Sequence, residues 1–286
     1  MDAKGGIITV PRPIVVHFHI FKNAGTTIDW ILQKNFAIDA VKFDDLQRAA
    51  NIYPPEKIVE MATKYNYAKS LSSHQIRFPL PKADDFTFLP IVFVRHPIDR
   101  AVSIYNFTKI EDRDDAYHRL AKSSTLKQFV EANFENKEYT HLKNPQTRWL
   151  AQEIKEFNPP LRLARAIEYI NSSAIIGVVD RIDESLVVAE NILRPFFPKI
   201  DMAYISQNVS IGRTGTLEEK LAQIRKEIGD NTMLKLKMRN DLDFQIYEHA
   251  NKELDRRIEK IERMGEKLSN FRERCNLLYM KGKRNV

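Results

Sequence analysis

One cysteine is all that this chain of 286 residues contains, and no apolar stretch in it reaches the length of about 18 residues that a membrane-spanning helix needs. The single cysteine, Cys275, excludes an internal disulfide and a thiolate metal cluster, and it is typical of a protein from a reducing compartment. The N-terminal residues also lack the apolar core of a secretory signal. We therefore expect a cytoplasmic protein without a membrane span.

Two further absences bear on nucleotide chemistry. The P-loop pattern GxxxxGK[ST] is missing, because Lys22 precedes Gly25, whereas the pattern requires a lysine after its glycine. We also find no hydrophobic strand that ends in an acidic residue suited to hold Mg²⁺, as a kinase would need. Both absences disfavour a nucleotide-dependent kinase, which stays the main alternative enzyme.

The formal net charge of +7 is concentrated near the C-terminus. Residues 251–286 hold eleven lysines and arginines and six acidic residues, so this segment alone contributes +5. No zinc-finger, helix-turn-helix or RNA-binding pattern accompanies the excess charge. We read the basic segment as a solvated face and expect no nucleic-acid partner.

Near the N-terminus, the apolar and β-branched residues 14–20 lead into a short polar segment and then into a helix that begins near Gly25. The apolar run is typical of a central strand. Lys22 adds a positive charge after the strand, while Thr26 and Thr27 add hydroxyls and amides where the helix begins. The first amides of a helix lack intrahelical partners and lie at the positive end of its dipole, so they bind anions. The stretch predicts a phosphate cradle, with an ordinary strand-to-helix turn as the alternative.

A second stretch repeats this arrangement. The buried strand predicted for Ile91–Val94 ends in Arg95, and Pro97 stands where a helix begins, since its missing N–H costs nothing there. Ser103 would follow about two turns along that helix. Two strand ends that present lysine, arginine, serine and threonine predict a site for a ligand with two separated anionic groups.

The two stretches read Phe18-His-Ile-Phe-Lys-Asn-Ala-Gly-Thr-Thr27 and Phe93-Val-Arg-His-Pro-Ile-Asp-Arg-Ala-Val-Ser-Ile-Tyr105. Together they resemble the nucleotide motifs of the sulfotransferases that use 3′-phosphoadenylyl sulfate (PAPS). The sequence looks closest to the carbohydrate type, which includes the heparan sulfate and uronosyl 2-O- and 6-O-sulfotransferases, and the resemblance covers roughly residues 13–255. It implies an α/β fold with a central parallel sheet flanked by helices, similar in layout to the P-loop NTPases.

The resemblance also implies which residues bind the donor, because the first motif of the family holds the 5′-phosphosulfate and the second holds the 3′-phosphate. These residues are Lys22, Asn23, Ala24, Gly25, Thr26, Thr27, Arg95 and Ser103. Asn23 departs from the family pattern, in which a threonine is commoner, and this weakens one expected hydroxyl contact. Lys22 is also expected to be catalytic, because negative charge grows on the oxygen between sulfur and phosphorus during transfer.

A second catalytic residue, His74, follows the strand predicted for residues 67–73. Ligands of α/β proteins bind beyond the carboxyl ends of the strands, so this histidine is well placed for chemistry. By resemblance, His74 matches the base of the glycan sulfotransferases, and a pKa near neutrality suits a group that takes a proton from a hydroxyl. The alternative is a surface histidine with satisfied hydrogen bonds.

The acceptor is expected to contact His74, Arg77, Gln146 and Arg148. The amide and guanidinium groups can hydrogen-bond the hydroxyls or carboxylates of a sugar, although Arg148 could instead form a structural ion pair. In the family, a basic loop closes over the 3′-phosphate and adenine. By resemblance, residues 206–216 would be that loop and would add Arg213 and Thr214 to the donor-binding residues, with a plain loop between helices as the alternative.

We expect no metal site. His17 and His19 share one face of the first strand, but we find no cysteine or acidic residue at a suitable spacing to join them. We therefore interpret both histidines as core residues or as residues behind the site.

Apolar residues recur every seven positions near the C-terminus, which predicts a long helix with one apolar seam. One series is Tyr247, Leu254, Ile261, Leu268 and Cys275, and the other is Met264, Phe271 and Leu278. We divide the chain into a sulfotransferase domain of residues 1–250 and a helical extension of residues 251–286. The seam could pack on this domain or pair with another copy, and we expect a homodimer.

Taken together, the sequence predicts transfer of a sulfuryl group from PAPS to a hydroxyl, on a carbohydrate acceptor. The alternatives are a nucleotide-dependent kinase and a non-catalytic module that binds a nucleotide or a glycan.

Overall fold

A five-stranded parallel sheet forms the centre of the protein in the computed structural model, which describes residues 10–48, 51–152, 158–205 and 215–284. The strands are β1 (Arg12–Phe18), β2 (Ala40–Lys42), β3 (Ser70–Ser73), β4 (Phe86–Val94) and β5 (Ile175–Val178). Their order across the sheet is β2-β3-β1-β4-β5. Because all strands run in the same direction, their carboxyl ends meet at one edge of the sheet.

Helices make up most of the remaining described chain. They are α1 (Gly25–Phe36), α2 (Glu56–Lys64), α3 (Pro97–Ile110), α4 (Ala116–Ser123), α5 (Leu126–Glu135), α6 (Pro145–Leu150), α7 (Pro159–Ser172), α8 (Ile182–Leu193), α9 (Leu217–Ile228), α10 (Asp230–Arg239), α11 (Asp241–Ile258) and α12 (Met264–Arg284). Three short 3₁₀ turns, Ala37–Asp39, Leu46–Arg48 and Val179–Arg181, complete the set. Among the described residues, no helix combines the length and apolar character needed to cross a membrane.

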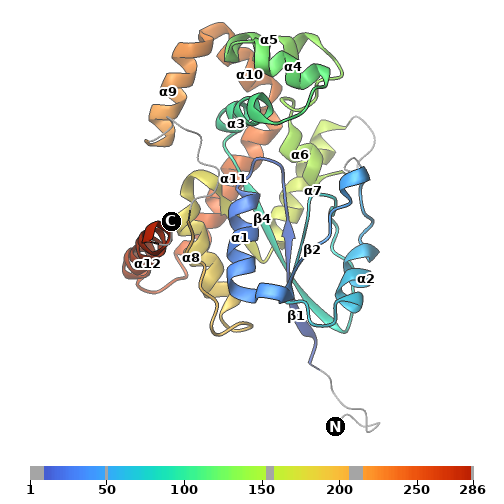
Figure 1. Cartoon of the computed structure of the whole chain (residues 1–286), viewed down its shortest axis with the longest axis vertical. Helices are drawn as coiled ribbons and strands as arrows, with labels where there is room; N and C mark the ends of the chain where they lie inside the picture. Colours follow the sequence, from blue (N-terminus) through green and yellow to red (C-terminus); the bar gives the residue numbers. More distant parts are fainter. Residues whose placement is uncertain (1–9, 49–50, 153–157, 206–214, 285–286) are drawn as a thin grey trace.

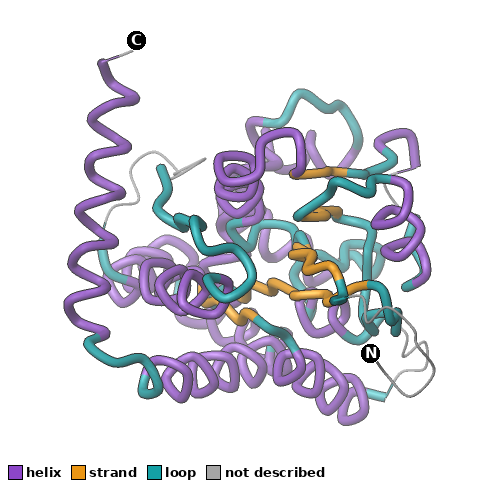
Figure 2. Tube along the Cα trace, turned by 90° about the horizontal axis from the view of Figure 1, so that it is seen from below, coloured by secondary structure: helices purple, strands orange, loops and turns teal. Residues whose placement is uncertain are grey.

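Both faces of the sheet are covered, which confirms the predicted α/β architecture (Figures 1 and 2). Side chains of a strand alternate between the two faces, so Val15 of β1 packs with α1, α8 and α12, whereas Ile14 and Val16 pack with α2, α7 and α11. A third apolar cluster joins α3, α4, α5, α9 and α10. These helices form a cap above the sheet in Figure 1, on the side of the strands' carboxyl ends.

The long C-terminal helix is present as α12, but the seven-residue pattern runs over two helices. α11 ends at Ile258, and Arg263 adopts a left-handed conformation (φ 55°) just before α12 begins. The two helices lie on opposite faces of the sheet, and Phe271 of α12 is fully buried in the cluster shared with α8. This part of the seam therefore packs on its own chain. α11 continues through residue 250, and the division there and the homodimer stay predictions.

Candidate active site

The loop between β1 and α1 has the geometry of an anion cradle. Lys22 and Ala24 both adopt left-handed conformations, with φ angles of 64° and 61°, and α1 begins without a side-chain cap. The amide of Thr27 donates to the carbonyl of Ala24 at 3.0 Å. No acceptor within the described parts of the chain faces the amides of Ala24, Gly25 and Thr26. Amides without described partners on a left-handed turn and at a helix start are typical of an anion-binding loop.

Gly25 is required in this loop by the close approach of His19. A Cβ atom at position 25 would lie 2.0 Å from both Cδ2 and Nε2 of the His19 ring. The imidazole thus occupies the space that any other side chain would need. It also follows that the Cδ2–Nε2 edge of His19 lies directly against the cradle.

Arg100 and Asn23 hold the cradle loop in place through hydrogen bonds. The buried Arg100 guanidinium donates from Nη2 and Nε to the carbonyl of Phe21 at 2.9 and 3.1 Å, and from Nε to Asn23 Oδ1 at 3.2 Å. Asn23 Nδ2 donates to the carbonyl of Phe93 and to Gln146 Oε1, each at 2.7 Å. The Asn23 side chain is 1% exposed, so it shapes the loop and does not make the donor contact that we expected of it.

Gln146 joins the two strand-end loops and is fully buried. Its Oε1 accepts from the backbone N–H of Arg95 at 2.9 Å, and its Nε2 donates to the carbonyl of the same residue at 2.9 Å. The backbone N–H of Gln146 donates to the buried carboxylate of Asp243 at 3.1 Å. The expectation that Gln146 contacts the acceptor is therefore wrong for its side chain, which holds Asn23 and Arg95 in place beneath the site.

The two predicted cations of the donor site, Lys22 and Arg95, are neighbours. Arg95 Nη1 donates to the carbonyl of Lys22 at 3.1 Å, and Arg95 Nε pairs with Asp99 at 2.6 Å. The Lys22 ammonium lies 4.2 Å from the centroid of the Phe107 ring. Burial, together with the charges of Arg95 and Arg100, lowers the pKa of Lys22 to about 8. Ser103 lies farther along α3 and is 7% exposed.

His74 has the orientation of a general base. Its Nδ1 lies 3.0 Å from the carbonyl oxygen of His19, and since a carbonyl can only accept, Nδ1 carries the proton. Nε2 is then the free acceptor of the neutral ring. Burial, followed by the influence of His19, lowers the pKa of His74 to about 4, so the ring is neutral at pH 7. Arg77 supports this segment by donating from Nη1 to the carbonyl of His74 at 2.6 Å.

Asp29, on α1, corrects the expectation that no acidic residue joins the first two histidines. Its carboxylate accepts from His17 Nδ1 at 2.8 Å, from His19 Nδ1 at 3.2 Å and from Ser72 Oγ at 2.5 Å. Lys42 Nζ also pairs with it at 2.7 Å. Burial would raise the pKa of Asp29, but the hydrogen bonds from both histidines bring it below its usual range.

A metal ion could in principle use this group, because ligand atoms of His17, His19 and Asp29 lie within 4.8 Å of one another. However, the Lys42 ammonium already supplies a cation to the Asp29 carboxylate, and every described partner of that carboxylate is a hydrogen-bond donor. We therefore interpret the group as a hydrogen-bond network. Asp29 stands about one turn into α1, on the side of the helix that packs against β1. This position in the sequence was the signal that could have paired Asp29 with the two histidines.

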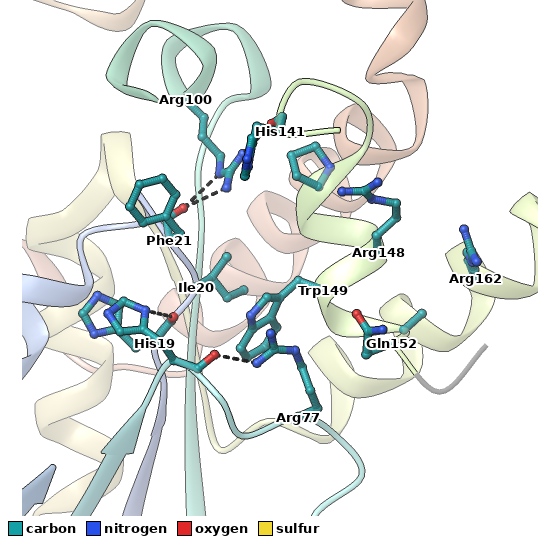
Figure 3. A pocket seen from close by; sticks show the side chains of 13 residues that line it. His19, Ile20, Phe21, Arg77, Arg100, His141, Arg148, Trp149, Gln152 and Arg162 are labelled. Atoms are coloured by element: carbon teal, nitrogen blue, oxygen red, sulfur yellow. Dashed lines mark hydrogen bonds between the residues drawn. The ribbon is translucent and has the colours of Figure 1, made fainter. Parts of the chain in front are cut away.

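A cavity of about 640 Å³ opens beside His19 and His74 (Figure 3). Four arginines line it: Arg77, Arg100, Arg148 and Arg162. His141 and Trp149 contribute further walls, and the Arg77 guanidinium lies 4.3 Å from the centroid of the Trp149 ring. No acidic residue of the described chain lines this cavity, so its character is strongly cationic. Sequence reasoning missed the roles of Arg100 and Arg162 here.

Three remaining expectations concern the borders of the site. Arg148 donates from Nη2 to the carbonyl of Thr140 at 3.0 Å and forms no ion pair with a described carboxylate, so the structural ion pair is not seen. Arg213 and Thr214 lie outside the described residues, and their contact with the donor stays a prediction. Asp180 lies in the 3₁₀ turn after β5 and accepts from the Tyr247 hydroxyl at 2.7 Å, and the expectation that no hydrophobic strand ends in an acidic Mg²⁺ ligand stays a prediction.

The cradle and the paired strand ends thus lie together at the carboxyl edge of the parallel sheet. The sequence matches the sulfotransferase family over residues 6–250, and the chain therefore belongs to that family. It is also similar to an uncharacterized protein of Archaeoglobus fulgidus, with 28% identity over 248 residues that make up 83% of this chain and 95% of the relative. The predicted membership of the sulfotransferase family is thus confirmed, and the carbohydrate type stays a prediction.

Proposed function

We propose that this protein transfers the sulfuryl group of PAPS to a hydroxyl of a carbohydrate that carries acidic groups. The observation that supports this best is the position of His74, which lines the cationic cavity, contacts the His19 ring that lies against the cradle, and presents an unprotonated Nε2. A donor on one side and a hydroxyl acceptor on the other would both be within reach of that nitrogen. The motif resemblance to carbohydrate sulfotransferases supports the choice of acceptor class.

The residues of the cradle fit the donor. Three amides without partners among the described residues are available to anionic oxygens, and the Lys22 ammonium adds a positive charge. Arg95 and Ser103 provide a guanidinium and a hydroxyl for the 3′-phosphate. When bound, PAPS supplies a sulfuryl group that is activated by its bond to the 5′-phosphate.

The mechanism assigns a separate task to each residue. Lys22 stabilises the negative charge that develops on the phosphate oxygen as the sulfur–oxygen bond breaks. His74 Nε2 takes the proton of the acceptor hydroxyl as the new oxygen–sulfur bond forms. The carbonyl of His19 holds His74 in the tautomer that can do so. Arg100, Asn23 and Gln146 keep the loop rigid, which pre-organises these groups.

The arginines of the cavity are proposed to select the acceptor. Arg77, Arg148 and Arg162 present guanidinium groups to a site that contains no described carboxylate. Guanidinium groups bind carboxylates and sulfates in a bidentate manner, and a neutral sugar offers no such anionic partner. An acceptor with acidic groups near the reacting hydroxyl therefore fits the cavity best.

The test compares two oligosaccharide acceptors that differ only in whether their uronic acids are intact or reduced to neutral sugars. With PAPS, the acidic acceptor should be sulfated with at least about tenfold higher kcat/KM, which corresponds to one charge-assisted contact. Arg148→Gln should remove most of this preference, whereas Arg119→Gln, on the exposed face of α4, should retain it. Equal use of both acceptors would contradict the acidic class, and no transfer to any hydroxyl would contradict the proposed activity.

A further inference from the structure

The His19 imidazole lies next to the cradle, and the proposed mechanism gives this side chain no task. Its Nδ1 donates to Asp29 at 3.2 Å, and its Cδ2–Nε2 edge lies against Gly25. The ring lines the cavity, and its Nε2 has no hydrogen-bond partner in the described portion of the chain. A ring nitrogen without a described partner thus lies beside Gly25, next to the amides of the cradle. This arrangement of carboxylate, imidazole and free Nε2 orients the ring for contact with a ligand.

The rings of His19 and His74 are in contact and tilted by 35°, with centroids 3.6 Å apart. Two cations at this distance repel each other strongly, so only one of the two rings can be charged at low cost. The proton on Nδ1 of His19 faces the Asp29 carboxylate, whereas that of His74 faces an uncharged carbonyl. A carboxylate stabilises an imidazolium more than a carbonyl does, so the structure favours His19 as the ring that becomes charged.

We propose that His19 is a donor-binding residue that takes up a proton from solvent when the phosphosulfate or the 5′-phosphate occupies the cradle, and that its Nε2–H then donates to the bound anion. In the same complex His74 stays neutral and can accept a proton from the acceptor hydroxyl. This inference rests on the proposed function, because it requires PAPS or its bisphosphate product as the ligand of the cradle.

The charged groups around His19 are consistent with a switch. His17 near the end of β1, Lys42 from β2 and His74 after β3 disfavour a proton on His19, and Asp29 from α1 favours one. Burial is the largest influence and lowers the pKa of His19, so the ring is neutral while the cradle holds no anion. A bound anion beside Nε2 reverses this balance by stabilising the charged form.

Two substitutions at position 19 separate a structural role from the proposed one. The amide of His19→Asn can take the place of Nδ1 and keep the hydrogen bond to Asp29, but it leaves nothing at the position of Nε2. The amide of His19→Gln can take the place of Nε2 and donate to an anion, but it does not titrate. His17→Gln is the matched control, because His17 also donates to Asp29 but lies 1% exposed and does not line the cavity.

The experiment is calorimetric titration of adenosine 3′,5′-bisphosphate into each protein, in buffers of different ionisation enthalpy, between pH 6 and pH 8.5. Near neutral pH, the number of protons taken up per bound bisphosphate should be larger for wild type and His17→Gln than for both His19 variants, by about half a proton or more. His19→Asn should bind about tenfold more weakly than wild type below neutral pH. His19→Gln should bind with less loss and with a weaker dependence on pH.

Several outcomes would overturn the inference. Equal proton uptake by wild type and both His19 variants would leave the proposed function in place and remove the switch. Full affinity and proton uptake in His19→Asn would show that only the contact with Asp29 matters. If neither variant folds, the imidazole ¹⁵N spectrum of the wild type decides, because the absence of any new imidazolium on bisphosphate binding would refute the switch. Failure of the wild type to bind bisphosphate would refute the proposed function and this inference together.

Discussion

Replacing Gln146 with leucine, a side chain of similar size without polar atoms, should destabilise the fold and loosen both strand-end loops at once. The Gln146 amide is the only described partner of the backbone N–H and of the carbonyl of Arg95. Asn23 would keep its bond to Phe93, and the Asp243 carboxylate would keep Thr147. The substitution therefore leaves two backbone groups without these partners in a partly buried setting.

The magnitude follows from these two groups. Each buried donor or acceptor that loses its partner costs about 1–3 kcal/mol, and we expect a total loss of about 3 kcal/mol in the free energy of unfolding. For a chain of this size, that loss corresponds to a melting temperature lower by about 6 °C. Urea unfolding followed by circular dichroism measures the difference. The control is Gln245→Leu on the exposed face of α11, which should stay within about 0.5 kcal/mol of wild type.

The same variant also separates the two interpretations of Gln146. If its amide holds the loops, Gln146→Leu should weaken bisphosphate binding as well as stability, since Lys22 and Arg95 both lose their support. If the amide contacts the acceptor, as the sequence suggested, only the KM for the acceptor should rise. An unfolding free energy equal to that of Gln245→Leu, with unchanged bisphosphate affinity, would refute the reasoning.

Three further predictions concern single side chains. Lys22→Ala should lower turnover more than about a hundredfold with an unchanged unfolding midpoint, and near-normal turnover would remove Lys22 from the mechanism. Because burial and neighbouring charges lower the pKa of Lys22 to about 8, wild-type affinity for bisphosphate should begin to fall as the pH rises past 8, and a curve parallel to that of Lys22→Ala would contradict this. His74→Ala should abolish transfer and keep bisphosphate binding, and an active variant would move the role of base to another histidine. Burial would lower the pKa of His118, but Asp115 and Glu111 raise it above 6.5. The ion pairs of charged His118 therefore stabilise the fold below pH 6.5, and this stabilisation is lost as the pH rises through the folded-state pKa. His118→Gln should be less stable than wild type at low pH, and a difference in unfolding free energy that does not shrink with rising pH would contradict this.

Local patterns were sufficient to predict the main elements around the site. The apolar run before the cradle is β1, and Pro97 is the first residue of α3. β4 begins at Phe86, earlier than the strand predicted for Ile91–Val94. The prediction missed the first half of β4 because it contains Pro90, and proline normally argues against a central strand. The seven-residue pattern near the C-terminus identified an apolar seam but contained no signal for the break at Arg263 that sends its halves to opposite faces of the sheet.

The tertiary contacts beneath the site could not be predicted in this way. Gln146 reaches Asn23 across 123 residues of sequence, and Asp29 meets His17 and His19 only because α1 packs back on β1. Such contacts depend on how elements pack, and periodicity or spacing within one element carries no information about them. The sequence therefore identified the residues at the edge of the sheet and missed those that hold them in place.

The central claim is that the cradle and the second strand end bind a nucleotide with separate 5′- and 3′-phosphates. Calorimetry with adenosine 3′,5′-bisphosphate, AMP and ATP with Mg²⁺ tests it directly. We predict tight binding of the bisphosphate without any metal, and affinity for AMP about tenfold or more lower, because AMP lacks the group that Arg95 and Ser103 would hold. Equal or tighter binding of ATP with Mg²⁺ would contradict the account and favour a kinase.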